Sequence, residues 1–475
     1  MSERKLQRRD FLKTVGAAAV AGPSLLTRGA RAVESNRKPN VLIIVADDQR
    51  HDTIAALGND HIRTPNLDRL AGDGFAFTSA RCMGSQQGAV CVPSRAMLHT
   101  GRTLFHVPDD LAQFPMLGQV LQENGYDSFG CGKWHNGPAS FNRGFNAGGN
   151  IFFGGMHDQF KTPVHDYSPA GKYPPKSARV PGRFSSELFA DAALDFLRDK
   201  RSADRPFFCY LAFTSPHDPR TPPAPYDRMY DPGKMPLPAN FLPEHPFDNG
   251  ELRIRDEMLA PFPRTPDDTR KQLCDYYGMI SSQDAQVGRL LSALEESGQL
   301  DNTIILYTGD HGLAIGSHGL FGKQNVYDHS SRIPLLIAGP GIPRSSRSDA
   351  LVYGFDLFPT LCELLNIKPP ETIEGKSLAG IITGRDARVR DSAFHAYLHS
   401  ENGKTIGTQH AVTDGRWKYI RYDVRGTTHM QLFDLASDPD EIHDLSVDSV
   451  ASKQLPRLSS LLQRWQKDLA EPATG

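Results

Sequence analysis

Four short clusters of acidic, cationic and imidazole side chains are the parts of this sequence best suited to chemistry. They contain Asp47 and Asp48, Lys133 and His135, His217, and Asp310 and His311. Three carboxylates brought together would repel one another and raise their pKa values unless a cation lay between them. Oxygen ligands of this kind favour Ca²⁺ or Mg²⁺. Each cluster alone is typical of a helix cap or an ordinary surface residue, so a metal-dependent site requires that they meet.

Cys91, in the stretch CVPSR, is a fifth candidate for chemistry. Pro93 suits the first turn of a helix, which we expect from Ser94 to His99, ending near Gly101. Cys91 would then lie at the positive N-terminal end of that helix, where an anion would meet free backbone N–H groups and Arg95. The alternative interpretation is a buried thiol that packs a loop against the sheet.

Buried strands must position these clusters. Apolar runs at 40–45, 207–213 and 303–308, and a shorter one at 126–130, each precede one cluster and alternate with helical segments. This pattern predicts an α/β fold with a large, mostly parallel sheet flanked by helices. Ligands of such sheets bind beyond the carboxyl ends of the strands. We therefore expect the four clusters to converge at one edge.

The rest of the chain divides into a catalytic domain, expected over residues 38–384, and a small C-terminal subdomain over residues 390–475. Apolar residues at helical spacing predict a long core helix over 271–294; they are Leu273, Tyr277, Ile280, Val287, Leu290 and Leu291. Short runs near 416–420 and 431–435 predict an antiparallel sheet in the subdomain, followed by a helix over 453–469. Loops over 135–183 and 217–265 are expected to shape a substrate pocket.

The N-terminus has the features of an export signal. Arg8-Arg9-Asp10-Phe11-Leu12-Lys13 precedes an apolar run of small residues and then Ala30-Arg31-Ala32. This predicts a twin-arginine signal peptide over residues 1–32, cleaved after Ala32, and export by the twin-arginine machinery to the periplasm or the medium. The apolar run is too short for stable membrane insertion.

Composition excludes some classes of partner. The chain has 53 basic and 55 acidic residues and a formal charge of −2, so no bulk field attracts nucleic acid. Cysteines other than Cys91 lack the close spacing of a disulfide framework or a zinc site, and we expect most of them to be buried small hydrophobes. They are Cys82, Cys131, Cys209, Cys274 and Cys362.

The segment CVPSR, followed by Thr100-Gly101-Arg102, resembles the signature of the type I, formylglycine-dependent sulfatases of the alkaline phosphatase superfamily. The resemblance continues in order through the four clusters, Gly322-Lys323, and two C-terminal segments at 412–419 and 432–435. It covers nearly all of the chain after the signal, and its pattern is closest to iduronate-2-sulfatase-like and choline-sulfatase-like bacterial members. It implies the alkaline-phosphatase-like fold.

The resemblance also implies a covalent modification. A formylglycine-generating maturation enzyme would oxidise Cys91 to Cα-formylglycine, whose aldehyde hydrates to a geminal diol. One diol oxygen would attack the sulfate sulfur as the alcohol leaves, and collapse of the resulting sulfo-enzyme to the aldehyde would expel sulfate. A serine could be sulfated but could not eliminate sulfate in this way.

Roles for individual residues follow from the same resemblance. Arg95 would position the diol, Lys133 and Lys323 would clamp sulfate oxygens, His135 would assist elimination, and His217 would protonate the leaving alcohol. The metal ligands would be Asp47, Asp48, residue 91, Asp310 and His311. Many members carry Asn at the position of His311, and a nitrogen ligand is better tolerated by Mn²⁺ or Zn²⁺ than by Ca²⁺. We expect one Ca²⁺, with Mn²⁺ or Mg²⁺ as alternatives.

Several substrates remain open. A sulfated carbohydrate is the first expectation, and Arg220 and His318 are candidates for contacting its hydroxyls or a uronate carboxylate. A choline-sulfatase-like enzyme would need a cage for a quaternary ammonium. Hydrolysis of phosphonate monoesters or phosphodiesters by the same nucleophile is a third possibility. A catalytically inactive glycan-binding protein is a different class, but every expected catalytic position is occupied.

Overall fold

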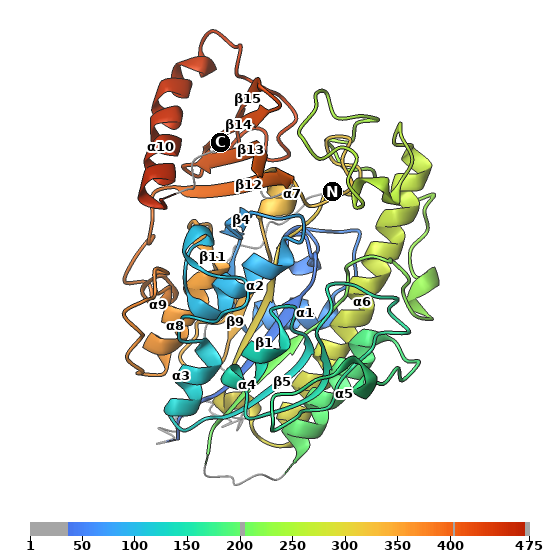
Figure 1. Cartoon of the computed structure of the whole chain (residues 1–475), viewed down its shortest axis with the longest axis vertical. Helices are drawn as coiled ribbons and strands as arrows, with labels where there is room; N and C mark the ends of the chain where they lie inside the picture. The colour runs from blue at the N-terminus through green and yellow to red at the C-terminus, as the bar shows by residue number, and fades with distance from the viewer. Residues whose placement is uncertain (1–36, 200–204, 402–403, 471–475) are drawn as a thin grey trace, which may run out of the picture. The chain divides into compact units, whose positions relative to one another are not determined.

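An eight-stranded sheet forms the centre of the molecule (Figure 1). The computed structural model describes residues 37–199, 205–401 and 404–470, and the signal peptide predicted over residues 1–32 lies outside these ranges. The strand order is β10-β2-β9-β8-β1-β7-β5-β6. Only β9 runs against its neighbours, so the predicted mixed, mostly parallel sheet is confirmed. The strands are β1 (Asn40–Ala46), β2 (Gly74–Phe77), β5 (Asp127–Lys133), β6 (Ala147–Phe152), β7 (Phe207–Ala212), β8 (Thr303–Gly309), β9 (Leu335–Ala338) and β10 (Ser346–Ser348).

Helices cover both faces of this sheet because side chains of the central strands alternate between two cores. In β1, Ile43 and Val45 point to one hydrophobic core, and Leu42 and Ile44 point to the other. The first core contains side chains of α2 (Cys91–Thr100), α3 (Leu117–Glu123), α4 (Pro138–Gly144), α8 (Leu357–Leu364) and α9 (Ala379–Ile382). The second contains side chains of α1 (Pro65–Gly72), α5 (Ser185–Arg198) and α6 (Pro266–Glu296).

A second sheet stands above the first in Figure 1 and contains the four strands of the C-terminal segment 390–470. Its order is β15-β14-β13-β12-β4, an antiparallel meander to which β4 adds in parallel. The strands are β4 (Gly84–Ser85), β12 (Ala393–Glu401), β13 (Lys404–Thr413), β14 (Trp417–Val424) and β15 (Thr427–Asp434). The helix α10 (Leu455–Asp468) follows. A separate two-stranded sheet joins β3 (Ala80–Arg81) and β11 (Val352–Tyr353), and α7 (Asp328–Ser331) is a single turn.

The strand β4 connects the second sheet to the segment that leads into Cys91. Gly84 pairs with Ala396 of β12 and has a φ of 115°, and a Cβ at this position would lie 1.8 Å from the Ala396 carbonyl oxygen. Only glycine permits so close an approach. The C-terminal sheet therefore includes residues from before position 90, and the domain boundary expected between residues 384 and 390 remains a prediction.

Several expectations about helices, strands and core residues differ from the structure, among them the last helix, which begins at Leu455 rather than at residue 453 and ends at Asp468. The helix α6 begins at Pro266, five residues earlier than expected, because Thr265 accepts a hydrogen bond from the Asp268 amide at 3.1 Å as its N-cap. Within α6, Tyr276 is fully buried, whereas the predicted Tyr277 is only partly so. The segment 135–183 is also more ordered than a loop, since it contains α4 and the edge strand β6. Its sequence AGGNIF has few residues with high strand propensity, which hides the strand.

Candidate active site

The four clusters converge at one edge of the main sheet. Strands β8, β1, β7 and β5 are adjacent and parallel, so their carboxyl ends lie side by side. Asp47 and Asp48 follow β1, Asp310 and His311 follow β8, and His217 follows β7 by a short loop. Lys133 is itself the last residue of β5 rather than part of the following loop. The expected convergence is confirmed.

Cys91 lies at the start of α2, as expected, although the helix begins at Cys91 itself and runs to Thr100. Gly101 ends it with a φ of 66°. The side chain is buried, and its Sγ lies 3.1 Å from His135 Nδ1 and 3.5 Å from Lys133 Nζ. Burial by itself raises the pKa of this thiol, but Lys133, His135 and His311 outweigh it and hold the pKa well below its usual value. The surroundings of residue 91 therefore favour a negative charge on its side chain.

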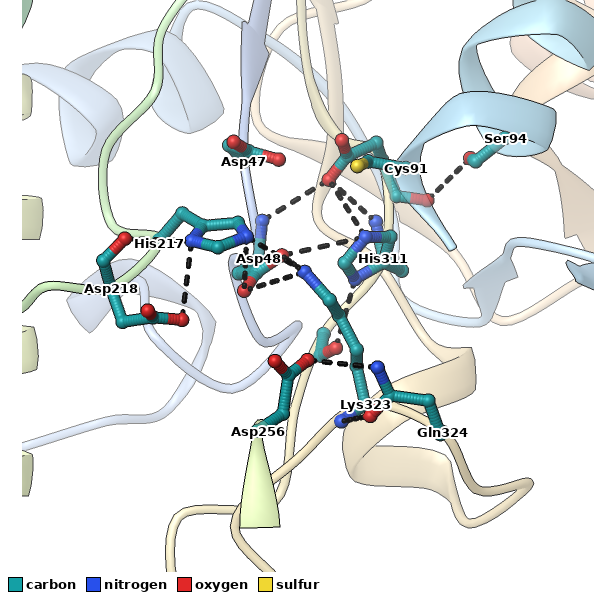
Figure 2. A network of polar contacts seen from close by, with 12 residues as sticks. Asp47, Asp48, Cys91, Ser94, His217, Asp218, Asp256, His311, Lys323 and Gln324 are labelled. Atoms are coloured by element: carbon teal, nitrogen blue, oxygen red, sulfur yellow. Dashed lines mark hydrogen bonds and ion pairs between the residues drawn. The ribbon is translucent and has the colours of Figure 1, made fainter. Parts of the chain in front are cut away.

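Carboxylate, imidazole and thiol groups meet beside Cys91. Ligand atoms of Asp47, Cys91, Asp310 and His311 all lie within 4.8 Å of one another. The Asp48 carboxylate lies at the border of this group, with Oδ1 3.4 Å from His311 Nε2. Figure 2 shows Asp48, Cys91 and His311 close together, from the segments that follow β1 and β8 and from the start of α2. The structure thus brings all five predicted ligands together.

The electrostatics of this group are those of a site for a cation. Asp47 Oδ1 and His311 Nε2 are buried and have no hydrogen-bond partner among the described residues. Burial, together with Asp310, raises the pKa of Asp47 well above its usual value despite Lys133. Burial lowers the pKa of His311, but Asp310 and Asp48 outweigh it and raise that pKa to about 9. Carboxylates that force a proton onto a buried imidazole would be better neutralised by a divalent cation.

Arg95 fixes the position of the acidic residues from the α2 side. Its side chain is fully buried; Nε donates to Asp310 Oδ2 at 3.0 Å and Nη1 to the Lys133 carbonyl at 2.9 Å. Ser94 Oγ donates to the Asp310 carbonyl at 2.6 Å. Arg95 is therefore well placed to orient Asp310 beside residue 91.

Two lysines flank the site. Lys133 Nζ lies 2.6 Å from Asp47 Oδ2, and Lys323 Nζ lies 2.9 Å from Asp48 Oδ1 and 2.9 Å from His217 Nε2. Burial lowers the pKa of each ammonium, but nearby carboxylates and Cys91 outweigh it and raise the pKa, so both lysines are charged. Together with Arg95 they balance the three aspartates, and a bound divalent cation would leave the site positive, as an anionic sulfate ester requires.

Some residues of the site were not predicted from the sequence. Tyr276 of α6 donates from its hydroxyl to the Asp48 carbonyl at 2.6 Å. Asp218, Asp256 and Gln324 surround His217 and Lys323 (Figure 2). Asp218 and Gln324 are direct chain neighbours of predicted residues, which is the one sequence signal that could have indicated them.

The candidate sugar-contacting residues are both buried. His318 is 5% exposed; its ring stacks on Tyr327 at 3.9 Å and its Nε2 lies 3.1 Å from Asn240 Nδ2. It is part of the packing between loops and does not support the expected sugar contact. Arg220 is 8% exposed and donates from Nη1 to Gln272 at 2.9 Å.

The remaining cysteines are buried and unpaired among the described residues, as predicted. None of the helices in the described part of the chain has the length and apolar character that a bilayer crossing requires.

Comparison with known proteins agrees with this geometry. The sulfatase family model matches residues 39–367, and the model of the N-sulphoglucosamine sulphohydrolase C-terminal region matches residues 316–468. The chain belongs to the sulfatase family. This sulfatase is 25% identical over 503 residues to N-acetylglucosamine-6-O-sulfatase of Bacteroides thetaiotaomicron, covering 91% of this chain and 87% of the relative. It is therefore a sulfuric ester hydrolase.

Solved structures share the fold of this sulfatase. The structure of BT4656 in complex with its substrate D-glucosamine-2-N,6-O-disulfate matches with a TM-score of 0.75 at 24% identity, covering 92% of this chain and 99% of that one. A phosphonate monoester hydrolase of Agrobacterium radiobacter matches with a TM-score of 0.72 at 25% identity, covering 90% and 96%. Both support the alkaline-phosphatase-like fold expected from the sequence.

Proposed function

We propose that this sulfatase is exported and releases inorganic sulfate from a sulfated carbohydrate, using a formylglycine made from Cys91. The observation that carries the proposal is the meeting of Cys91 with Lys133, His135 and the acidic group at one buried edge. Resemblance to a carbohydrate sulfatase over 91% of the chain supports the substrate class.

The residues present fit a divalent cation. Asp47, Asp48, Asp310 and His311, with residue 91, would hold it, and the unpartnered Asp47 Oδ1 and His311 Nε2 are ligand atoms of the required kind. Oxygen atoms dominate the set, which favours Ca²⁺, and the single nitrogen leaves Mn²⁺ or Mg²⁺ as alternatives. When bound, the cation would supply Lewis-acid polarisation of oxygen atoms beside residue 91.

The side chains around residue 91 divide the remaining work. After oxidation of Cys91 by a maturation enzyme, residue 91 supplies the nucleophilic oxygen. Lys133 and Lys323 contact the sulfate oxygens and offset the charge that grows on them. His135, whose Nδ1 lies 3.1 Å from Cys91 Sγ, takes the proton released when sulfate is eliminated. His217, whose Nε2 lies 2.9 Å from Lys323 Nζ, gives a proton to the leaving alcohol.

Two other substrates stay as candidates. Resemblance to a phosphonate monoester hydrolase over 90% of the chain favours testing a phosphonate monoester beside sulfate esters. The sequence pattern also favours testing choline sulfate.

The experiment measures sulfate release by enzyme co-expressed with a maturation enzyme, with Cys91→Ala as the control. Substrates are oligosaccharides from several sulfated polysaccharides, choline sulfate, and phenyl phosphonate monoester with phenol release as readout. We expect the wild type to release sulfate from the oligosaccharides of at least one polysaccharide, and Cys91→Ala to release none. Unchanged turnover in Cys91→Ala would contradict the mechanism, and cleavage of choline sulfate or the phosphonate alone would contradict the substrate. Mass spectrometry of the peptide containing residue 91 checks the modification.

Export is tested separately by fractionation. Full-length protein should appear in the periplasm or the medium, and replacement of Arg8 and Arg9 by Lys should retain it in the cytosol. Cytosolic wild-type protein would contradict the proposed location.

A further inference from the structure

His217 presents its two ring nitrogens to different partners, as Figure 2 shows. Nε2 lies 2.9 Å from Lys323 Nζ, and Nδ1 lies 2.8 Å from the Asp218 carbonyl oxygen and 3.2 Å from Asp218 Oδ1. A carbonyl oxygen can only accept a hydrogen bond and an ammonium can only donate one. The neutral ring therefore carries its hydrogen on Nδ1, and the only atom that can take a second proton is Nε2.

The Asp218 carboxylate, which faces His217, is also bound by Arg255. Arg255 Nη1 lies 3.3 Å from Asp218 Oδ1, and Nη2 contacts Oδ2. The Asp218 side chain is 5% exposed and that of Arg255 is 47% exposed, so the guanidinium covers a buried carboxylate from the solvent side. Burial raises the pKa of Asp218, but His217, Arg255 and Arg220 outweigh it and hold the pKa below its usual value. The carboxylate facing His217 is thus charged.

Further hydrogen bonds connect Arg255 to Lys323 through Asp256 and Gln324. Arg255 Nη1 lies 2.8 Å from Asp256 Oδ1, and Gln324 Nε2 donates to Asp256 Oδ2 at 2.8 Å. Gln324 Oε1 in turn accepts from the Lys323 amide at 3.0 Å. Lys323 Nζ contacts His217 Nε2, and Asp218 contacts His217 Nδ1. The imidazole is therefore held at both ring nitrogens by residues of one connected network.

A second cation site is the competing explanation, because Asp48, His217 and Asp218 offer ligand atoms within 4.8 Å of one another. The ammonium of Lys323 already occupies the position between Asp48 and His217, at 2.9 Å from each. In addition, the nitrogen of His217 that faces Asp218 carries a hydrogen and offers no lone pair. The group is therefore organised for proton placement.

We propose that the Asp218 carboxylate, clamped by Arg255, is the positioning group that holds the imidazolium form of His217 while the Asp218 carbonyl keeps the hydrogen on Nδ1, so that Nε2 donates the proton. This inference rests on the proposed function, in which His217 protonates the leaving alcohol. As the bond between sulfur and the alcohol oxygen breaks, its electron pair stays on that oxygen, which takes the proton from Nε2. The ring returns to the neutral form with hydrogen on Nδ1, the form that the observed contacts require. Before the transfer, Lys323 Nζ contacts a sulfate oxygen in place of Nε2, so that Nε2 can carry the proton, and Asp218 offsets the charge of the imidazolium.

The test compares two substrates of similar shape, 4-nitrophenyl sulfate and 4-methoxyphenyl sulfate, whose phenolates differ in their need for protonation. Asp218→Asn should lower kcat/KM for the 4-methoxyphenyl ester by about 10²-fold and for the 4-nitrophenyl ester by less than about tenfold. In a His217→Gln background, Asp218→Asn should change little, because residues that act as a unit are not additive. Equal losses on both esters, or an undiminished effect in the His217→Gln background, would overturn the proposal.

A second variant, at the half-exposed Arg255, keeps the proposal testable if Asp218→Asn does not fold. Arg255→Gln should show the same preference for the 4-nitrophenyl ester with a smaller loss, whereas Arg253→Gln should change neither rate more than about twofold. Arg253 is a matched control because its guanidinium packs over the Phe262 ring at 4.7 Å. An Arg255→Gln protein that behaves like Arg253→Gln would count against the clamp. Failure of the proposed function would be seen differently, as turnover that persists in Cys91→Ala.

Discussion

Two buried clusters of charged side chains in this molecule arrange their charges in opposite ways. In the junction cluster (Arg81, Asp328, Lys418 and Glu441), cations and anions alternate where the C-terminal sheet meets the rest of the chain. Arg81 Nη1 and Lys418 Nζ each lie 2.7 Å from Asp328 Oδ1, and Lys418 also contacts Glu441 at 2.5 Å. In the catalytic cluster (Asp47, Asp48, Asp310 and His311), acidic groups instead gather around one imidazole.

This difference distinguishes the junction cluster, a structural network of ion pairs, from the catalytic cluster, a candidate binding site. Asp328, although buried, has its pKa held well below the usual value by Arg81 and Lys418. In the catalytic cluster, acidic side chains raise the pKa of His311 to about 9 against the effect of burial. Both clusters are buried and charged, so burial and charge alone do not mark a functional site. Convergence of several carboxylates beside one imidazole does, because these groups together offer ligand atoms to a cation even where Lys133, Lys323 and Arg95 offset their charge.

The largest expected difference between the two clusters is the effect of a substitution on catalytic activity. Asp47→Asn should lower kcat/KM for a sulfate ester by about 10³-fold, because it removes a cation ligand beside residue 91. Its free energy of unfolding in EDTA should fall by less than that of Asp328→Asn, because burial already opposes the charge of Asp47 in the cation-free protein, although Lys133 loses a carboxylate at 2.6 Å. Sulfate release and urea unfolding measure the two effects. Strong destabilisation with activity retained would place Asp47 with the structural residues.

The junction cluster should respond in the opposite way. Asp328→Asn leaves Arg81 and Lys418 buried without their carboxylate and should lower the free energy of unfolding by about 3–5 kcal/mol. Assayed below its unfolding transition, the remaining folded protein should keep kcat/KM within about threefold of the wild type. Urea unfolding and sulfate release again provide the measurements. A loss of turnover comparable to that of Asp47→Asn would show that the two clusters are coupled.

The sequence was informative where chemistry follows a strand directly. Asp47, Asp310 and Lys133 lie at or next to the ends of apolar runs, so one rule about parallel sheets places them together. No comparable rule relates Asp218 to Arg255, or Asp328 to Lys418. These partners are 37 and 90 residues apart, and Arg255 lies outside regular helices and strands.

The errors in predicting the fold from the sequence have similar causes. The start of α6 depends on the N-cap Thr265, which apolar spacing does not detect, and β6 consists largely of glycine, alanine and asparagine. His318 has a residue type suited to sugar binding, but its contact with Tyr327 depends on how distant loops pack. Residue type near a motif therefore predicts contacts much less well than position at a strand end.

Removal of divalent cations should distinguish the clusters by stability. A cation bound to the folded state at 100 times its dissociation constant stabilises it by about 2.7 kcal/mol. EDTA should therefore lower the unfolding temperature of the wild type and of Asp328→Asn alike, and barely change that of Asp47→Asn. Differential scanning calorimetry with and without added Ca²⁺ measures these shifts, and Mn²⁺ and Mg²⁺ in parallel test the identity of the ion. An equal EDTA effect in Asp47→Asn would exclude its role as a ligand.

The smallest expected effect concerns His395, which lies beside the junction cluster. Burial lowers its pKa from 6.5 to about 3, and the charges of Lys418 and Arg81 contribute, although a contact with the Cys82 backbone opposes them. A depressed pKa in the folded state means that the neutral ring stabilises the protein above about pH 6.5, and that this stability is lost as the pH falls toward 3. Between pH 7.5 and 5.5 the loss from this residue should be about 1.4 kcal/mol.

Urea unfolding at the two pH values tests this expectation. His395→Gln should reduce the pH-dependent loss of stability by about 1.4 kcal/mol, whereas His61→Gln, at an exposed position, should leave it unchanged. If His395→Gln retains the full pH dependence, burial beside the junction cluster does not keep this imidazole neutral in the folded protein, and the stability lost on acidification comes from other groups.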